Sequence, residues 1–168
     1  KEFININRTN TNLRGLRKGI KGLNCVMLPS DSVVSEMEYN ILVVDDEESV
    51  HEILTLFLVR KKKHTFTVHS ALSGKAGIEM YSKLAKEGRK PDLVLMDLLM
   101  PGMDGIEATK RIIEDDPGAN IYLFTADAKA KEEDALKAGA KGVIPKMTDW
   151  YEMAEDIIHI LESSGPAF

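Results

Sequence analysis

From residue 41 onward, short apolar runs alternate with longer amphipathic segments, and this alternation restricts the chain to few folds. Each run is too short for a helix, and most are rich in β-branched or aromatic residues, as strands are. Three runs are continuously apolar, which is typical of parallel strands with helices on both faces. The predicted strands are 41–44, 65–68, 93–96, 121–124 and 142–144.

Five amphipathic segments are predicted to be helices, at 49–60, 73–87, 104–114, 128–138 and 148–162. Their expected N-caps are Ser73, Asp104 and either Thr148 or Asp149, and Gly139 is expected to end the fourth helix in a left-handed conformation. Strands and helices in strict alternation predict an α/β fold, (βα)5, with a doubly wound parallel five-stranded sheet.

The chain has 168 residues and is 43% hydrophobic, which suits one domain with a single large core. No run of apolar residues is long enough to span a membrane, and the N-terminus lacks the pattern of a secretory signal. Cys25 has no second cysteine with which to form an internal disulfide. We therefore expect a soluble, cytoplasmic protein.

The predicted domain occupies 39–162 and is followed by a tail at 163–168. Residues 1–38 are interpreted as an N-terminal extension, mostly irregular, in which 1–30 carry six Lys or Arg and one acidic residue. A basic arm that touches nucleic acid or a membrane surface is one interpretation. We favour the other, a non-native or tag-derived appendage, because no motif organises the cations.

The candidate site residues follow four of the five predicted strands. Asp45 and Asp46 follow the first, Asp97 the third, Thr125 the fourth and Lys146 the fifth. Because function gathers at the carboxyl ends of strands in such sheets, we expect these side chains to converge. Clustered carboxylates need a compensating cation, and an all-oxygen ligand set suits Mg²⁺. An aspartate beside Mg²⁺ can accept a phosphoryl group as an aspartyl phosphate.

Four motifs, "ILVVDDEES", "LVLMDLLMPGMDG", "LFTADA" and "GAKGVIPK", resemble the receiver (CheY-like) domain of two-component response regulators. The resemblance covers about residues 39–162 and implies the flavodoxin-like strand order 2-1-3-4-5, which is the order given for this family. It implies Mg²⁺-dependent transfer of a phosphoryl group from a sensor histidine kinase or a phosphotransfer protein, which switches protein-protein interactions in a phosphorelay. Such a domain is not an enzyme with a separate substrate, since it catalyses only its own phosphorylation and dephosphorylation.

The resemblance also assigns roles to individual residues. It makes Asp97 the phosphoacceptor, and it makes Asp46 a direct Mg²⁺ ligand, Asp45 a ligand through water and Leu99 a ligand through its backbone carbonyl. The phosphoryl group would then be contacted by Thr125 and Lys146. Expected partners are the kinase or phosphotransfer protein and an unidentified downstream protein, with a homodimer through the fourth and fifth helices as a further option, and no nucleic acid or membrane.

The sequence departs from the usual receiver pattern at two positions. The family usually has a proline after the conserved lysine, with a cis peptide bond, whereas here Pro145 precedes Lys146 and Met147 follows it. We predict a trans Lys146–Met147 bond, because a cis bond without proline costs about 3 kcal/mol, and an edge position for Pro145. Val143 stands where many relatives have an aromatic residue that rotates on activation, so that rotation cannot be the output.

Simpler interpretations stand beside these assignments. Asp45 and Asp46 could be ordinary helix N-caps. The "RKKK" segment at 60–63 invites a nucleic-acid role, but we interpret it as solvated charge that complements the C-terminal dipole of the first helix. All four histidines, His51, His64, His69 and His159, are interpreted as structural or surface residues.

Two other classes of function remain open at this point. One is a phosphohydrolase of the haloacid dehalogenase type, although that family has its nucleophile after the first strand in a D-x-D motif. The other is a degenerate receiver that binds partners without phosphorylation, against which the intact acidic and basic residues argue.

Overall fold

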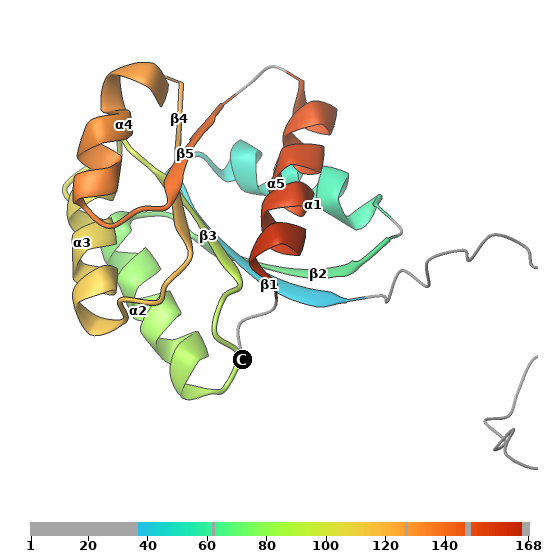
Figure 1. Ribbon diagram of the computed structural model, residues 1–168, viewed down its shortest axis with the longest axis horizontal. Coiled ribbons are helices and arrows are strands. Elements are labelled where there is room, and N and C mark those ends of the chain that lie inside the picture. The colour runs from blue at the N-terminus through green and yellow to red at the C-terminus, as the bar shows by residue number, and fades with distance from the viewer. Residues whose placement is uncertain (1–36, 62, 127, 147–148, 166–168) are drawn as a thin grey trace, which may run out of the picture. The chain divides into compact units, whose positions relative to one another are not determined.

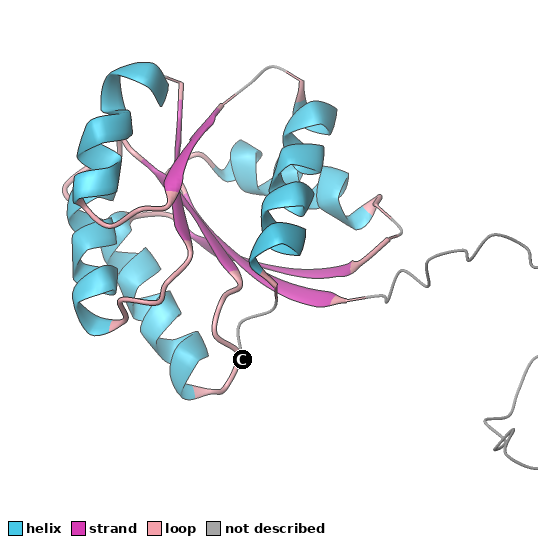
Figure 2. Cartoon of the chain, viewed as in Figure 1, coloured by secondary structure: helices cyan, strands magenta, loops and turns pink. Residues whose placement is uncertain are grey.

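The computed structural model describes residues 37–61, 63–126, 128–146 and 149–165, and these form an α/β domain (Figures 1 and 2). The strands are β1 (Glu38–Val44), β2 (Thr65–Ala71), β3 (Leu93–Asp97), β4 (Ile121–Thr125) and β5 (Gly142–Pro145). The helices are α1 (Glu48–Val59), α2 (Gly74–Lys86), α3 (Gly105–Asp115), α4 (Ala128–Lys137) and α5 (Trp150–Ser164). The predicted extension lies outside the described residues up to residue 36.

All five strands pair in parallel in the order β2-β1-β3-β4-β5, so the predicted fold class and strand order are confirmed. β1 lies between β2 and β3, so the chain adds β2 on one side of β1 and then β3, β4 and β5 on the other side. β5 is an edge strand, as predicted for Pro145, which is paired in register with Thr125 of β4.

Two hydrophobic layers cover the two faces of the sheet. On one face, Ile41 and Val43 of β1 and Leu95 of β3 pack with residues of α1 and α5. On the other face, Leu42 and Val44 pack with residues of α2, α3 and α4. Figure 1 shows this division of the helices. Successive strand residues point to opposite faces, so both alternating sets must be apolar, which explains the continuous apolar runs.

The helix boundaries follow local capping chemistry. Ser73 and Asp104 accept hydrogen bonds from the N–H groups of Ala76 and Glu107, and Asp149 caps α5, so these predicted caps are confirmed. Gly139, with φ of +95°, follows α4 in the predicted left-handed region. The N-cap of α1 is Glu47, without a side-chain hydrogen bond, so the interpretation of the acidic pair before it as N-caps is wrong.

The basic segment 60–63 follows the last turn of α1, and its members differ: Arg60 and Lys63 are exposed, whereas Lys61 is largely covered. The Lys61 side chain is only 12% exposed, forms an ion pair with Glu155 of α5 and lies over the Tyr151 ring, 3.3 Å from its centroid. The prediction of solvated charge is therefore wrong for Lys61. Its ammonium joins the end of α1 to α5.

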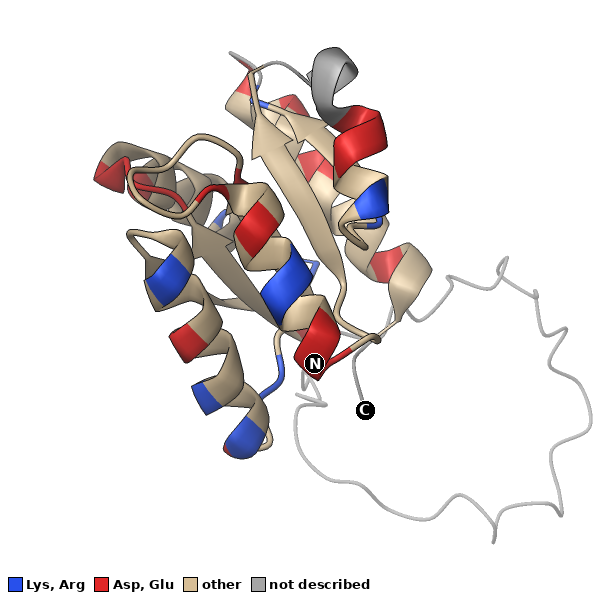
Figure 3. Ribbon diagram, turned by 90° about the vertical axis from the view of Figure 1, so that its left-hand side faces the viewer, with Lys and Arg blue, Asp and Glu red and all other residues tan. Residues whose placement is uncertain are grey.

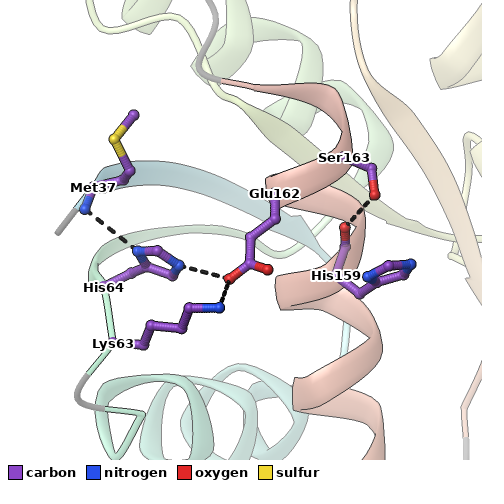
Figure 4. A network of polar contacts seen from close by, with 6 residues as sticks. All are labelled: Met37, Lys63, His64, His159, Glu162 and Ser163. Carbon is purple, nitrogen blue, oxygen red and sulfur yellow. Dashed lines mark hydrogen bonds and ion pairs between the residues drawn. The ribbon is translucent and has the colours of Figure 1, made fainter. Parts of the chain in front are cut away.

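Buried His64 joins the start of β1 to the end of α5 (Figure 4). The N–H of Met37 donates to Nδ1 at 3.3 Å, so the proton of a neutral ring is on Nε2, which lies 2.8 Å from Glu162 Oε1. Lys63 forms an ion pair with the same carboxylate at 2.6 Å. This arrangement agrees with a structural role for His64.

Charged residues lie mainly on the helices and loops, and the strands are largely free of them (Figure 3). α2 and α3 each carry both signs of charge. Within the described ranges, the structure contains no helix with the length and apolarity needed to cross a membrane.

Candidate functional site

The carboxyl ends of four strands carry the predicted site residues to one edge of the sheet. Asp45 directly follows β1, Asp97 ends β3, Thr125 ends β4 and Lys146 directly follows β5. Asp46 is the next residue of the loop between β1 and α1. Parallel pairing of β1 with β3 and of β4 with β5 aligns these strand ends, although the residues are far apart along the chain.

Three carboxylates meet at this edge. Asp45, Asp46 and Asp97 each present an oxygen atom, and these atoms all lie within 4.8 Å of one another. Asp45 and Asp97 are buried, whereas Asp46 is exposed. Clustered carboxylate oxygens with one side open to water are the ligands that Mg²⁺ prefers, so the residues present fit a hard divalent cation. We refer to these three aspartates and Lys146 as the acidic pocket.

The Lys146 ammonium bridges two of the carboxylates. Its Nζ atom lies 2.8 Å from Asp45 Oδ2 and 2.8 Å from Asp97 Oδ1. Burial alone would lower the pKa of Lys146, but the hydrogen bonds to both carboxylates outweigh burial and raise that pKa. The ammonium therefore stays charged and compensates part of the negative charge of the pocket.

Asp97 is the carboxylate most affected by its surroundings. Burial is the main reason that its pKa is raised, and the charge of Asp45 adds to this effect, while Lys146 and a backbone hydrogen bond act in the opposite direction. A raised pKa means that the folded protein holds the Asp97 carboxylate at a cost. A further cation near the carboxylates would reduce that cost.

The loop after β3 is shaped around the Asp97 backbone and side chain. The N–H of Leu99 lies 3.2 Å from Asp97 Oδ2, to which it donates, and the Leu99 side chain is 76% exposed. Gly102 has a φ of +84°, in the left-handed region. A Cβ atom on Gly105 would lie 2.1 Å from the Asp97 carbonyl oxygen, so only glycine allows α3 to start this close to β3.

Thr125 is buried at the end of β4, and its carbonyl oxygen accepts a hydrogen bond from the Lys146 N–H at 2.9 Å. This bond continues the ladder of β4 and β5 past Pro145 and fixes the backbone of Lys146 beside Thr125. The predicted trans peptide bond falls on Met147, which lies outside the described residues. Val143 is partly buried against the layer that contains α4.

One contact to the acidic pocket was not predicted from the sequence. His51 Nε2 lies 2.8 Å from the Asp45 carbonyl oxygen. The interpretation of His51 as a structural or surface residue gave it no connection to the strand ends. Its spacing of six residues from Asp45 matches no ligand motif, so only the three-dimensional structure reveals the contact.

Comparison with known proteins identifies the family. The family model for the response regulator receiver domain matches residues 41–158 of this sequence. The chain belongs to this family. The matched range contains the five strands from Ile41 onward and all members of the acidic pocket. The domain is thus a receiver domain of a response regulator in two-component signalling.

Curated relatives agree with this assignment. The chain is 39% identical over 111 residues to the chemotaxis protein CheY of Halobacterium salinarum, covering 66% of this chain and 86% of that protein. It is 36% identical over 122 residues to the response regulator protein VraR of Staphylococcus saprophyticus, covering 72% of this chain and 56% of VraR. The chain therefore spans only about half the length of VraR.

Solved structures show the same fold. A two-component response regulator of the LuxR family from Aurantimonas sp. has a TM-score of 0.64 and 31% identity, covering 75% of this chain and 86% of that chain. The CheX-CheY complex with BeF₃ and Mg²⁺ from Borrelia burgdorferi gives a TM-score of 0.62 with 26% identity over 74% of this chain and 87% of that chain.

Proposed function

We propose that this receiver domain accepts a phosphoryl group on Asp97 in a reaction that requires Mg²⁺. The observation that carries the proposal is the meeting of three aspartate oxygens within 4.8 Å, with the Lys146 ammonium 2.8 Å from Asp97. The phosphoryl donor is a sensor histidine kinase or a phosphotransfer protein. The similar CheY from Borrelia burgdorferi, whose structure contains BeF₃ and Mg²⁺, supports the same chemistry here.

In this proposal, exposed Asp46 binds Mg²⁺ directly and buried Asp45 binds it through water. One oxygen of Asp97 and the backbone carbonyl of Leu99 complete the protein ligands. The exposure of Asp46 and Leu99 leaves this side of the pocket open to the donor. Bound Mg²⁺ would neutralise charge on the phosphoryl oxygens and orient them for transfer.

The transfer step forms one bond and breaks another. A carboxylate oxygen of Asp97 forms a bond to phosphorus while the bond from phosphorus to the imidazole nitrogen of the donor breaks. The departing imidazole keeps the electron pair of that bond and takes up a proton, and Asp97 becomes an acyl phosphate. Lys146 then transfers its contact from the Asp97 carboxylate to a phosphoryl oxygen, and the Thr125 hydroxyl binds another.

The output is a change in protein contacts. Because Thr125 and Lys146 are joined by a backbone hydrogen bond, movement of either residue toward the phosphoryl group displaces the ends of β4 and β5 together. Val143 removes the aromatic rotation seen in many relatives, so the switch here acts through the loops that follow β4 and β5. A downstream protein or a second receiver, docked on α4 and α5, would detect this displacement.

The test is incubation with acetyl phosphate and Mg²⁺, followed by measurement of intact mass. We expect the parent protein to gain the mass of one phosphoryl group, and Asp97→Asn to gain none. Asp104→Asn is the matched control, because asparagine caps a helix as well as aspartate does and Asp104 lies outside the acidic pocket. Labelling of Asp97→Asn, or equal labelling of the parent in EDTA, would contradict the proposal.

A further inference from the structure

The backbone of Asp45 extends one residue past the last strand pair of β1. Its N–H donates to the Ala71 carbonyl at 3.0 Å, which is the last bond of the ladder with β2. In a parallel ladder, the Asp45 carbonyl would next accept from the N–H two residues beyond Ala71. That residue is Ser73, where β2 has already ended and the chain turns into α2. The buried Asp45 carbonyl therefore needs another donor.

His51 supplies that donor. Its Nε2 atom lies 2.8 Å from the Asp45 carbonyl oxygen. A carbonyl oxygen can only accept, so Nε2 must carry the proton. In a neutral ring, Nδ1 then has the lone pair, and in the part of the chain that the structure describes this buried atom has no hydrogen-bond partner. His51 is 6% exposed, and among the described residues the bond through Nε2 is the only hydrogen bond of its ring.

The same bond fixes the start of α1 relative to β1. His51 is the fourth residue of α1, on its buried face, and the N-cap Glu47 makes no side-chain hydrogen bond. The loop of Asp46 and Glu47 is thus held at two points, by the Glu47 N–H on Asp45 Oδ1 at 3.0 Å and by His51 on the Asp45 carbonyl. Asp46, exposed between these points, has its backbone position set by both bonds.

We propose that His51 is a positioning residue of the acidic pocket, which holds the Asp45 carbonyl and thereby sets where the Asp45 and Asp46 carboxylates meet a divalent cation. This inference rests on the proposed function, since Mg²⁺ is the cation that the pocket would bind. His51 itself would be a ligand of neither the cation nor the phosphoryl group. It acts in the same way as the outer partners that orient the ligands of metal sites.

The experiment measures Mg²⁺ affinity directly, by titrating Mg²⁺ and following the amide NMR signals of the pocket. His51→Leu removes the donor and keeps an apolar side chain of similar size, and we expect its Kd for Mg²⁺ to rise about tenfold. His51→Gln restores an N–H donor at a position close to Nε2 and should recover most of the parent affinity. Leu54→Ala, in the next turn of α1, is the control and should lower Tm without changing the Kd.

Phosphorylation by acetyl phosphate provides a second measurement. We expect His51→Leu to be slow at low Mg²⁺ and to approach the parent rate at saturating Mg²⁺, because only the placement of the ligands is changed. A parent-like Kd in His51→Leu, or a Kd in His51→Gln as weak as in His51→Leu, would overturn the role of His51. Failure of the parent protein to bind Mg²⁺ would instead overturn the proposed function.

The proton position is tested without any metal or substitution. Long-range proton-nitrogen NMR spectra of the parent protein should show the His51 proton on Nε2 and a bare Nδ1. A proton on Nδ1 in the neutral ring would overturn the inference even if the His51 variants failed to fold.

Discussion

Lys146→Met tests how far one ammonium stabilises the acidic pocket before any metal binds. The Lys146 Nζ atom lies 2.8 Å from an oxygen of each of two buried carboxylates. Methionine keeps most of the length of the side chain and removes its charge. Asp45, whose side chain is fully buried, and Asp97 then face each other without the compensating cation.

The magnitude follows from these distances. At 2.8 Å and an effective dielectric constant of about 20, each contact contributes about 6 kcal/mol of attraction. Desolvation of the three charges and the repulsion between the carboxylates offset most of this sum, and removal of one partner from a buried ion pair costs about 3–5 kcal/mol. The Lys146 side chain is still 20% exposed, so we expect the lower end, a loss of about 3 kcal/mol.

Urea unfolding at neutral pH in EDTA measures this loss. Lys137→Met is the matched control, because Lys137 pairs with Glu133 on the exposed surface of α4 and should lose less than about 1 kcal/mol. The deficit of Lys146→Met should shrink at acidic pH, where Asp97, whose pKa is raised mainly by burial, becomes protonated. It should also shrink at a fixed Mg²⁺ concentration, because the pocket without the Lys146 ammonium binds the cation more tightly than the parent does and is stabilised more by it. Equal stability of Lys146→Met and the parent in EDTA would refute the reasoning.

Three further predictions concern stability. The pKa of Asp97 is raised above its ordinary value of 3.8, mainly by burial and further by the charge of Asp45, against the effect of Lys146. The folded protein therefore favours the protonated form of Asp97. The stability that this form contributes is lost as pH rises through the raised pKa. Asp97→Asn should therefore have a higher Tm than the parent at neutral pH, with the difference shrinking toward pH 3.8; a lower Tm at neutral pH would contradict this. Asp149→Ala should lose about 1 kcal/mol in urea unfolding, because the cap of the Tyr151 and Glu152 N–H groups is removed, whereas Asp149→Asn should lose little. Gly77→Ala should lose about 1–3 kcal/mol, because its Cβ would lie 2.8 Å from both methyl groups of Val44, and an unchanged urea midpoint would count against this overlap.

The sequence predicts the order and type of every element because each strand needs apolar residues on both faces. It predicts the ends of strands less well. β1 begins at Glu38 rather than residue 41, and β2 continues to Ala71 rather than ending at residue 68. These added residues include polar ones, such as Glu38 and Ser70, that take part in the backbone ladder of β1 and β2. Hydrophobicity cannot detect a pair that is held only by N–H and C=O groups.

The candidate site could be anticipated because the rule for parallel sheets gathers residues that follow strands at one edge. Contacts between helices could not be anticipated in this way. Lys61 reaches Tyr151 and Glu155, and His51 reaches the Asp45 carbonyl, only because α1 packs at a particular position against α5 and β1. Sequence spacing does not encode these contacts, so a basic segment and an isolated histidine gave no indication of their partners.

The acidic pocket draws its members from β1, β3 and the far end of β5, and this has a consequence during biosynthesis. Asp45 and Asp97 emerge from the ribosome well before Lys146, which follows the final strand of the sheet. Until that strand has docked, the early aspartates lack their counter-charge. Under the proposed function, products that stop before Lys146 should consequently accept no phosphoryl group, so that competence to receive a signal requires the last strand of the domain.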